Sequence, residues 1–128
     1  MKGNIDTNKI NRFQYFNELK NSKVVVSPFG LGEITLKDFE VFLTGGLLIK
    51  PNMNHMETWP PLFEDKKTFI TYKWDLSDFE FKLQSILENS EIRTSIAEEG
   101  QRNYAKYTSS KDASKLFIDH LKSILNSV

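Results

Sequence analysis

A carboxylate in the middle of a helix is the residue of this chain best suited to chemistry. Helical periodicity predicts a helix over residues 34–44, where Glu40 falls on a narrow polar stripe with Glu33, Lys37 and Thr44. One interpretation is a solvated ladder of ion pairs, because neighbouring charges on the stripe are three or four residues apart. The other is a binding role, because a fixed carboxylate is a strong acceptor for the vicinal hydroxyls of a nucleotide's ribose. The spacing leaves both interpretations open.

Apolar residues flank this stripe on both sides. Leu36, Phe39, Phe42 and Leu43 form one arc of the helix, and Ile34 and Val41 form the other. A helix that is apolar on two sides is expected to lie wedged between a sheet and neighbouring elements. Its polar stripe then faces either solvent or a cleft.

The turn before this helix could hold an anion. Gly30 and Gly32 would let a ligand approach the backbone closely, and the amides at the helix start, Gly32, Glu33, Ile34 and Thr35, could hold a diphosphate. Lys50 ends the next strand, where ligands gather in open α/β sheets, and is a candidate phosphate partner with a surface role as the alternative. His55, in the loop that follows, could contact a phosphate or a sugar, or be an incidental polar residue.

Alternating strand and helix patterns position these residues. Residues 1–8 are expected to form a loose lead-in and residues 51–67 a long connection, which in a compact domain is usually functional or mobile. The patterns predict strands at 23–27, 47–50 and 68–72, and helices at 9–21, 34–44, 77–88, 91–107 and 111–126. Gly45-Gly46 is expected to end the second helix. This order indicates an α/β domain with three layers and right-handed crossovers.

The remaining aromatic candidates have structural interpretations. The last helix presents an apolar face formed by Ala113, Leu116, Phe117, His120, Leu121, Ile124 and Leu125. His120 is therefore expected to be a packed core histidine. Trp59 and Trp74 are interpreted as packing anchors, with sugar stacking as the alternative.

Composition excludes several classes of protein. Among the 128 residues, 17 basic side chains balance 17 acidic ones, so no basic excess favours nucleic acid or a membrane surface as partner. The absence of cysteine excludes disulfides, zinc–thiolate sites and thiol nucleophiles, and the two histidines lie on distant elements, so no metal site is expected. No apolar run is long enough for a membrane span, and the first residues lack the pattern of a secretory signal. A cytoplasmic domain is expected.

The segment from Ser27 to Pro51 resembles the donor-binding segment of group 1 glycosyltransferases with the GT-B fold. It is most similar to the branch of spore-maturation glycosyltransferase-like proteins. The resemblance rests on Ser27-Pro28-Phe29-Gly30-Leu31-Gly32, Phe39-Glu40, Thr44-Gly45-Gly46 and Leu47-Leu48-Ile49, with Trp74–Asp78 and Ile96–Gln101 downstream. It covers roughly residues 20–125.

The resemblance implies a fold and a function. The fold would be a three-layer, Rossmann-like α/β domain with a short parallel sheet of about three to four strands flanked by helices. Residues 1–128 would be a single, partial C-terminal domain that binds a UDP- or GDP-type nucleotide sugar as substrate, with no other cofactor. Glu40 would bind the ribose, Gly32 to Thr35 would face the diphosphate, and Lys37 would take the place of a basic residue often found near the Phe-Glu pair.

The chain departs from the family in two ways. In many group 1 enzymes the two functional glutamates are one residue further apart than Glu33 and Glu40 are here. The resemblance therefore gives Glu33 no definite role. The N-terminal domain, which carries the acceptor site and often the catalytic base, has no counterpart here. No catalytic residue is therefore assigned, the chain is expected to be inactive alone, and a partner chain with the N-terminal domain or a second copy becomes a candidate partner.

Two other functions remain open. A shortened sheet exposes an edge, so the chain could be a non-catalytic interaction module that assembles through that edge. It could also be a different nucleotide-binding α/β domain.

Overall fold

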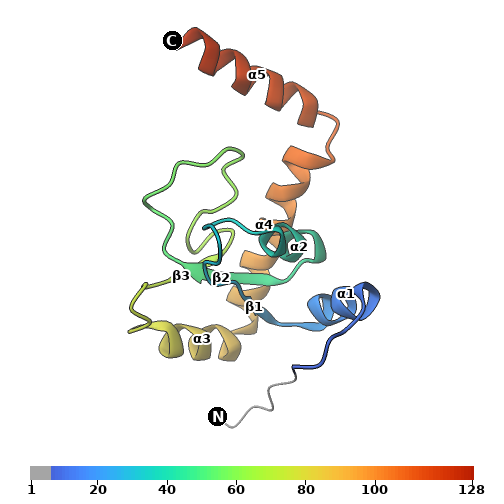
Figure 1. Cartoon of the computed structure of the whole chain (residues 1–128), viewed down its shortest axis with the longest axis vertical. Helices are drawn as coiled ribbons and strands as arrows, with labels where there is room; N and C mark the ends of the chain where they lie inside the picture. The colour runs from blue at the N-terminus through green and yellow to red at the C-terminus, as the bar shows by residue number, and fades with distance from the viewer. Residues whose placement is uncertain (1–6) are drawn as a thin grey trace.

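A computed structural model describes residues 7–128, so most of the lead-in predicted over residues 1–8 lies outside the described residues. The elements are α1 (Arg12–Asn21), β1 (Val24–Val26), α2 (Leu36–Thr44), β2 (Leu47–Pro51), β3 (Ile70–Tyr72), α3 (Phe79–Glu88), α4 (Ser90–Thr108) and α5 (Ala113–Asn126) (Figure 1). Every predicted helix and strand is present, with ends that differ by a few residues. A long connection without helix or strand joins β2 to β3, as predicted.

The three strands form one parallel sheet in the order β1-β2-β3. Val25 lies opposite Leu48, and Ile49 lies opposite Ile70. All five residues of the central strand β2 are buried, because both faces of the sheet are covered. The predicted α/β class and short parallel sheet are confirmed.

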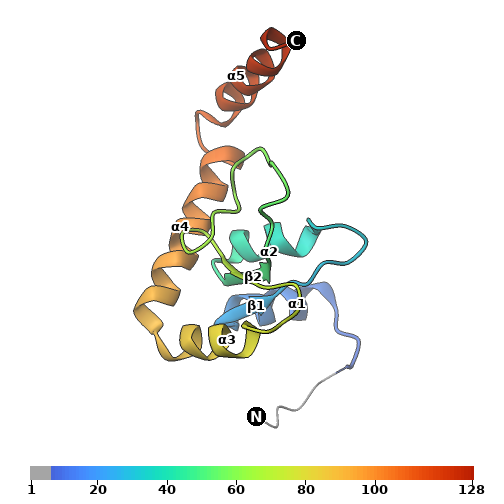
Figure 2. The same ribbon diagram turned by 90° about the vertical axis from the view of Figure 1, so that its left-hand side faces the viewer.

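Two apolar clusters hold the layers together. On one face, α1, α2 and the long connection pack against Leu48 of β2 and include the buried Phe42 and Phe69. On the other face, α3 and the first half of α4 pack against Leu47 and Ile49. Figure 2 shows α4 running alongside the sheet and α2, from α3 towards α5. A Cβ at Gly100 would lie 2.6 Å from a backbone oxygen, so α4 crosses the chain closely there.

Helix α2 leaves part of its predicted apolar arc exposed. Val41 and Phe42 are buried against β2, α1 and α4, whereas Leu36 is 72% exposed and Leu43 is 59% exposed. The expectation that Leu36 and Leu43 belong to a packed arc is wrong, because both side chains remain largely exposed. The helix ends at Gly45 as predicted, and the φ of 77° at Gly45 explains the preference for glycine there.

Helix α5 stands apart from the sheet (Figure 1). Its amphipathic pattern forms a helix as predicted, but none of its residues is buried. His120 is not a core histidine, because α5 extends beyond both clusters; its ring instead stacks on Trp59, with centroids 4.4 Å apart and planes within 4°. Trp59, which also contacts Tyr107 and Phe117, is the packing anchor that the sequence indicated.

None of the described helices combines the length and apolar character needed to cross a lipid bilayer.

Candidate functional site

A buried ion pair joins the start of α2 to the sheet. The ammonium of Lys50, near the end of β2, lies 2.9 Å from Oδ2 of Asp38, and neither side chain is exposed. The hydroxyl of Ser27 donates to Oδ1 of Asp38 at 2.6 Å, and the amide of Thr35 donates to Oδ2 at 2.9 Å. These contacts fix the loop after β1, the first turn of α2 and β2 relative to one another.

This network explains how two charges tolerate complete burial. A buried carboxylate or ammonium is costly unless it is paired and hydrogen-bonded. Asp38 accepts from three groups, and Lys50 also donates to the carbonyl of Ser27 at 3.4 Å and lies 5.5 Å from the ring centroid of Phe29. Lys50 is therefore sealed beneath the loop rather than presented to a phosphate, and it is not part of the site proposed below.

The glycine turn lies open above this network. The amide of Gly30 donates to the carbonyl of Gly32 at 3.1 Å, and a Cβ at either glycine would meet nothing within 4 Å. Neither glycine has a positive φ among the described residues. The backbone conformation therefore does not require glycine at either position, and the turn leaves space for a ligand beside its main chain.

Glu33 and His55 meet beside the turn. Nε2 of His55 lies 3.4 Å from Oε1 of Glu33, and the two side chains are 39% and 41% exposed. Glu33 precedes the first residue of α2, so it is not on the helical stripe that its spacing suggested. In the described part of the chain, no ion pair joins Glu33, Lys37 and Glu40 to one another, so the predicted ladder does not form.

Glu40 faces α1. The hydroxyl of Tyr15 donates to Oε2 of Glu40 at 2.7 Å in a partly buried contact. Burial, followed by the hydrogen bond to Glu40 and its charge, raises the pKa of Tyr15 to about 12. Because residues two apart on a helix point about 200° from each other, Glu40 lies almost opposite Asp38 on α2.

A shallow hollow of about 240 Å³ lies at the carboxyl edge of the sheet. We call it the carboxyl-edge hollow, and it is lined by Pro28, Phe29, Pro51, Tyr72, Trp74 and Leu76. Each lining residue lies at or just beyond the end of one of the three parallel strands. This edge is where open α/β sheets bind their ligands.

The described residues hold no group of three or more histidine, aspartate or glutamate side chains placed to bind a metal ion.

Comparison with solved structures gives a match to the C-terminal domain of a group 1 family glycosyl transferase from Francisella tularensis. The TM-score is 0.56 at 15% sequence identity, and the match covers 87% of this chain and 53% of that chain. The protein has the fold of that domain. It spans about half the length of the glycosyl transferase domain that it matches. No protein-family profile matches the sequence, and no curated protein matches it.

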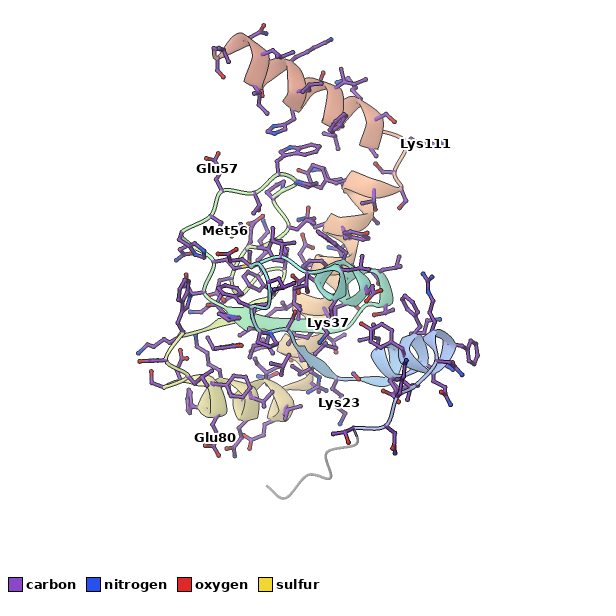
Figure 3. The ribbon with its side chains drawn as sticks, viewed as in Figure 1. Lys23, Lys37, Met56, Glu57, Glu80 and Lys111 are labelled. Atoms are coloured by element: carbon purple, nitrogen blue, oxygen red, sulfur yellow. The ribbon has the colours of Figure 1, made fainter. Side chains whose placement is uncertain are left out.

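The glycosyltransferase-like fold divides the predicted site residues into three groups. Gly30, Gly32, Glu33, Ile34, Thr35 and His55 gather around the turn and the start of α2. Glu40 lies on the α1 side of the same helix, and Lys37 lies on α2, where Figure 3 labels it. Lys50 lies beneath the turn.

Two residues near the site were not singled out from the sequence. Asp38 is buried in the ion pair, and Tyr15 donates a hydrogen bond to Glu40. Trp74, interpreted from the sequence as a packing anchor with sugar stacking as the alternative, is instead an exposed wall of the carboxyl-edge hollow. The spacing Thr35-x-x-Asp38 at a helix start could have indicated the capping contact of Asp38. Nothing local indicates Tyr15, which is 25 residues from its partner.

Proposed function

We propose that this chain is the donor-nucleotide-binding half of a glycosyltransferase that transfers a sugar from a nucleotide sugar to a hydroxyl acceptor. The observation that carries the proposal is the likeness of its fold to a group 1 glycosyl transferase C-terminal domain over 87% of the chain. The donor would be a UDP- or GDP-type nucleotide sugar bound at the carboxyl edge of the sheet.

Glu40 is the proposed ribose-binding residue. A carboxylate offers about four acceptor positions on its two oxygens, and the Tyr15 hydroxyl occupies one of them. The contact with Tyr15 would hold Glu40 in one orientation and leave acceptor capacity for a pair of ribose hydroxyls. Orientation of this kind lowers the entropy that ligand binding must overcome.

The open glycine turn and the start of α2 would face the diphosphate. Backbone amides and the positive end of the helix dipole favour an anion at such a position. Asp38 would not repel the diphosphate strongly, because its charge is compensated by Lys50 within the buried network. Lys37, half-exposed in the first turn of α2, would add a mobile positive charge.

We expect the isolated chain to bind the nucleotide sugar without transferring the sugar. The acceptor site would be supplied by a second unit, either a partner chain similar to the N-terminal half of a GT-B enzyme or a second copy. Such a division is proposed because the match is to the C-terminal domain of a glycosyl transferase, whereas the resemblance places the acceptor site in the N-terminal domain.

Calorimetric titration with UDP, GDP and their hexose conjugates tests this proposal. We expect one nucleotide series to bind and Glu40→Ala to weaken it by about tenfold or more, because hydrogen bonds to a charged group contribute about 1.5–3 kcal/mol. Glu57→Ala is the matched control, since Glu57 is an exposed carboxylate on the outer side of the long connection (Figure 3). Absence of heat with every nucleotide, or equal binding by the Glu40 and Glu57 variants, would refute the donor-site assignment.

A second candidate function is an interaction module that assembles through the edge of the sheet. The observation that favours it is β1, whose three consecutive valines are typical of a strand buried on both faces. In the structure β1 is an outer strand, and all three valines are only half-buried. Sedimentation velocity over a range of concentrations tests this function: a stable monomer that binds nucleotide favours the donor-binding role, and assembly without nucleotide binding favours the module.

A further inference from the structure

Trp74 combines a fixed position with an exposed ring. Its indole N–H donates to the carbonyl of Asn52 at 2.8 Å, and its ring makes edge contacts with Phe29 and His55 at centroid distances of 5.5 and 5.1 Å. The residue is nevertheless 61% exposed. A large aromatic ring that is held by three contacts and left open on one side is preorganised for stacking against a ligand.

The backbone beside Trp74 is also unusual. Leu76, which lines the same hollow, has a φ of 63° and is 58% exposed. A non-glycine residue in this conformation is uncommon, and such residues concentrate at ligand sites. The conformation turns the chain sharply after β3 and keeps Trp74 and Leu76 at the rim of the hollow.

The size and polarity of the hollow restrict what it can hold. Its volume of about 240 Å³ is below the roughly 300 Å³ at which pockets for whole drug-sized ligands begin, so it suits a single ring. Its walls are apolar and aromatic. Beside the platform, the His55 ring contacts Trp74 and also pairs with Glu33, so a carboxylate acceptor lies next to the His55 ring.

We propose that the carboxyl-edge hollow binds a sugar ring, with the apolar C–H face of the sugar on Trp74 and its hydroxyls towards Glu33 and His55. A sugar ring presents both an apolar face and several hydroxyl donors at its rim, which matches an aromatic platform beside a carboxylate. A nucleobase would use the platform but offers fewer donors to Glu33. Sugar binding here rests on the proposed function in that the ring would be the transferred sugar of the donor.

Two measurements on the full chain test the proposal. In calorimetry, we expect the wild type to bind the sugar nucleotide about tenfold more tightly than the corresponding free nucleotide. Trp74→Ala should remove this difference and leave binding of the free nucleotide unchanged. Glu40→Ala should weaken both ligands equally, so failure of the sugar site and failure of the donor-nucleotide site give different results.

The second measurement does not depend on nucleotide binding. In a Trp59→Phe background, Trp74 supplies the only indole N–H signal in a ¹H–¹⁵N spectrum. We expect at least one of four free sugars, tested at high concentration, to shift this signal in a saturable way: glucose, galactose, mannose or N-acetylglucosamine. Uridine and guanosine should not shift it. Glu33→Gln should weaken that shift.

Each alternative outcome overturns the proposal. A shift caused by nucleosides but not by sugars would assign the hollow to a base, and no saturable shift with any ligand would leave Trp74 as an exposed packing residue. If Trp74→Ala fails to fold, Trp74→Phe keeps an aromatic ring without the hydrogen bond to Asn52. The spectrum of the Trp59→Phe variant, in which Trp74 is intact, still decides the question.

Discussion

The two carboxylates of α2 lie two residues apart and have opposite surroundings. Asp38 points into the protein, is completely buried, and accepts from Ser27, Thr35 and Lys50. Glu40 points towards α1, is partly buried, and accepts from the hydroxyl of Tyr15. The helix therefore carries one carboxylate that is sealed within the fold and one that retains capacity to bind.

This difference shows that burial, rather than the presence of a charge, decides whether a carboxylate on this helix keeps acceptor capacity for a ligand. All the acceptor capacity of Asp38 serves to join the loop after β1 to β2. Glu40 has one strong partner, and a ligand could add to that contact without breaking a buried network. Glu33, which pairs with His55, is the most exposed of the three carboxylates, so Asp38, Glu40 and Glu33 form a series of decreasing burial.

The largest effect is expected at the buried end of the series. Lys50→Met leaves the Asp38 carboxylate buried without its cation, and breaking such a pair costs about 3–5 kcal/mol of unfolding free energy. Urea denaturation measures this loss. Lys37→Met removes the same charge from a half-exposed position on α2 and should change the stability by less than about 0.5 kcal/mol.

A double variant sharpens the same comparison. Asp38→Leu in the Lys50→Met background removes both charges and should recover much of the lost stability, because an apolar pair of similar volume avoids the desolvation cost. Equal stability of Lys50→Met and Lys37→Met would contradict the sealed network. The two lysines would then be equivalent in spite of their different burial.

An intermediate effect is expected at the partly buried contact. Tyr15→Phe removes the hydrogen bond to Glu40 and should lower the unfolding free energy by about 1 kcal/mol at neutral pH, measured by urea denaturation. The folded protein holds the phenol proton more tightly than the unfolded chain, since the pKa of Tyr15 is raised to about 12. The stabilisation by Tyr15 should therefore be complete below pH 10 and decline as the pH rises through about 12.

The wild type and Tyr15→Phe should accordingly converge in stability above pH 10. Glu40→Gln is the companion variant, because it removes the charge that helps to raise the pKa of Tyr15 but keeps a hydrogen-bond acceptor. A difference between wild type and Tyr15→Phe that stays constant from neutral pH to pH 12 would show that the hydroxyl contact does not control the titration.

The elements of the fold could be predicted from local sequence, and their ends only approximately. Runs such as Val24–Val26 and Leu47–Ile49 indicate parallel strands, and Gly45, whose φ of 77° is left-handed, marks the end of α2. These signals are local because hydrogen-bonding period and backbone conformation depend on neighbouring residues. Helical periodicity wrongly assigned Leu36 and Leu43 to a packed face, because the pattern cannot tell which side of a helix a neighbouring element covers.

The environment of each charge could not be predicted. Lys50 lies next to the last residue of β2, at the edge where open α/β sheets bind ligands, but its ammonium turns inward to an aspartate 12 residues away. Glu40 stood out because it interrupts an apolar helix, whereas Asp38 stood out less and is the more deeply buried of the two. Contacts of this kind depend on tertiary packing, which no single helix or strand pattern contains.

The smallest effect is expected at the exposed end of the series. Glu33→Gln removes the charge that faces His55, and because both side chains are about 40% exposed, the unfolding free energy should change by less than about 0.5 kcal/mol. Urea denaturation at low and high salt measures this change, and salt should reduce it further. The reverse variant His55→Gln is the matched control and should give an equally small loss. A loss as large as that of Tyr15→Phe would place Glu33 with the structural carboxylates, and any weakening of sugar binding by Glu33→Gln would then reflect a disturbed fold rather than a lost contact.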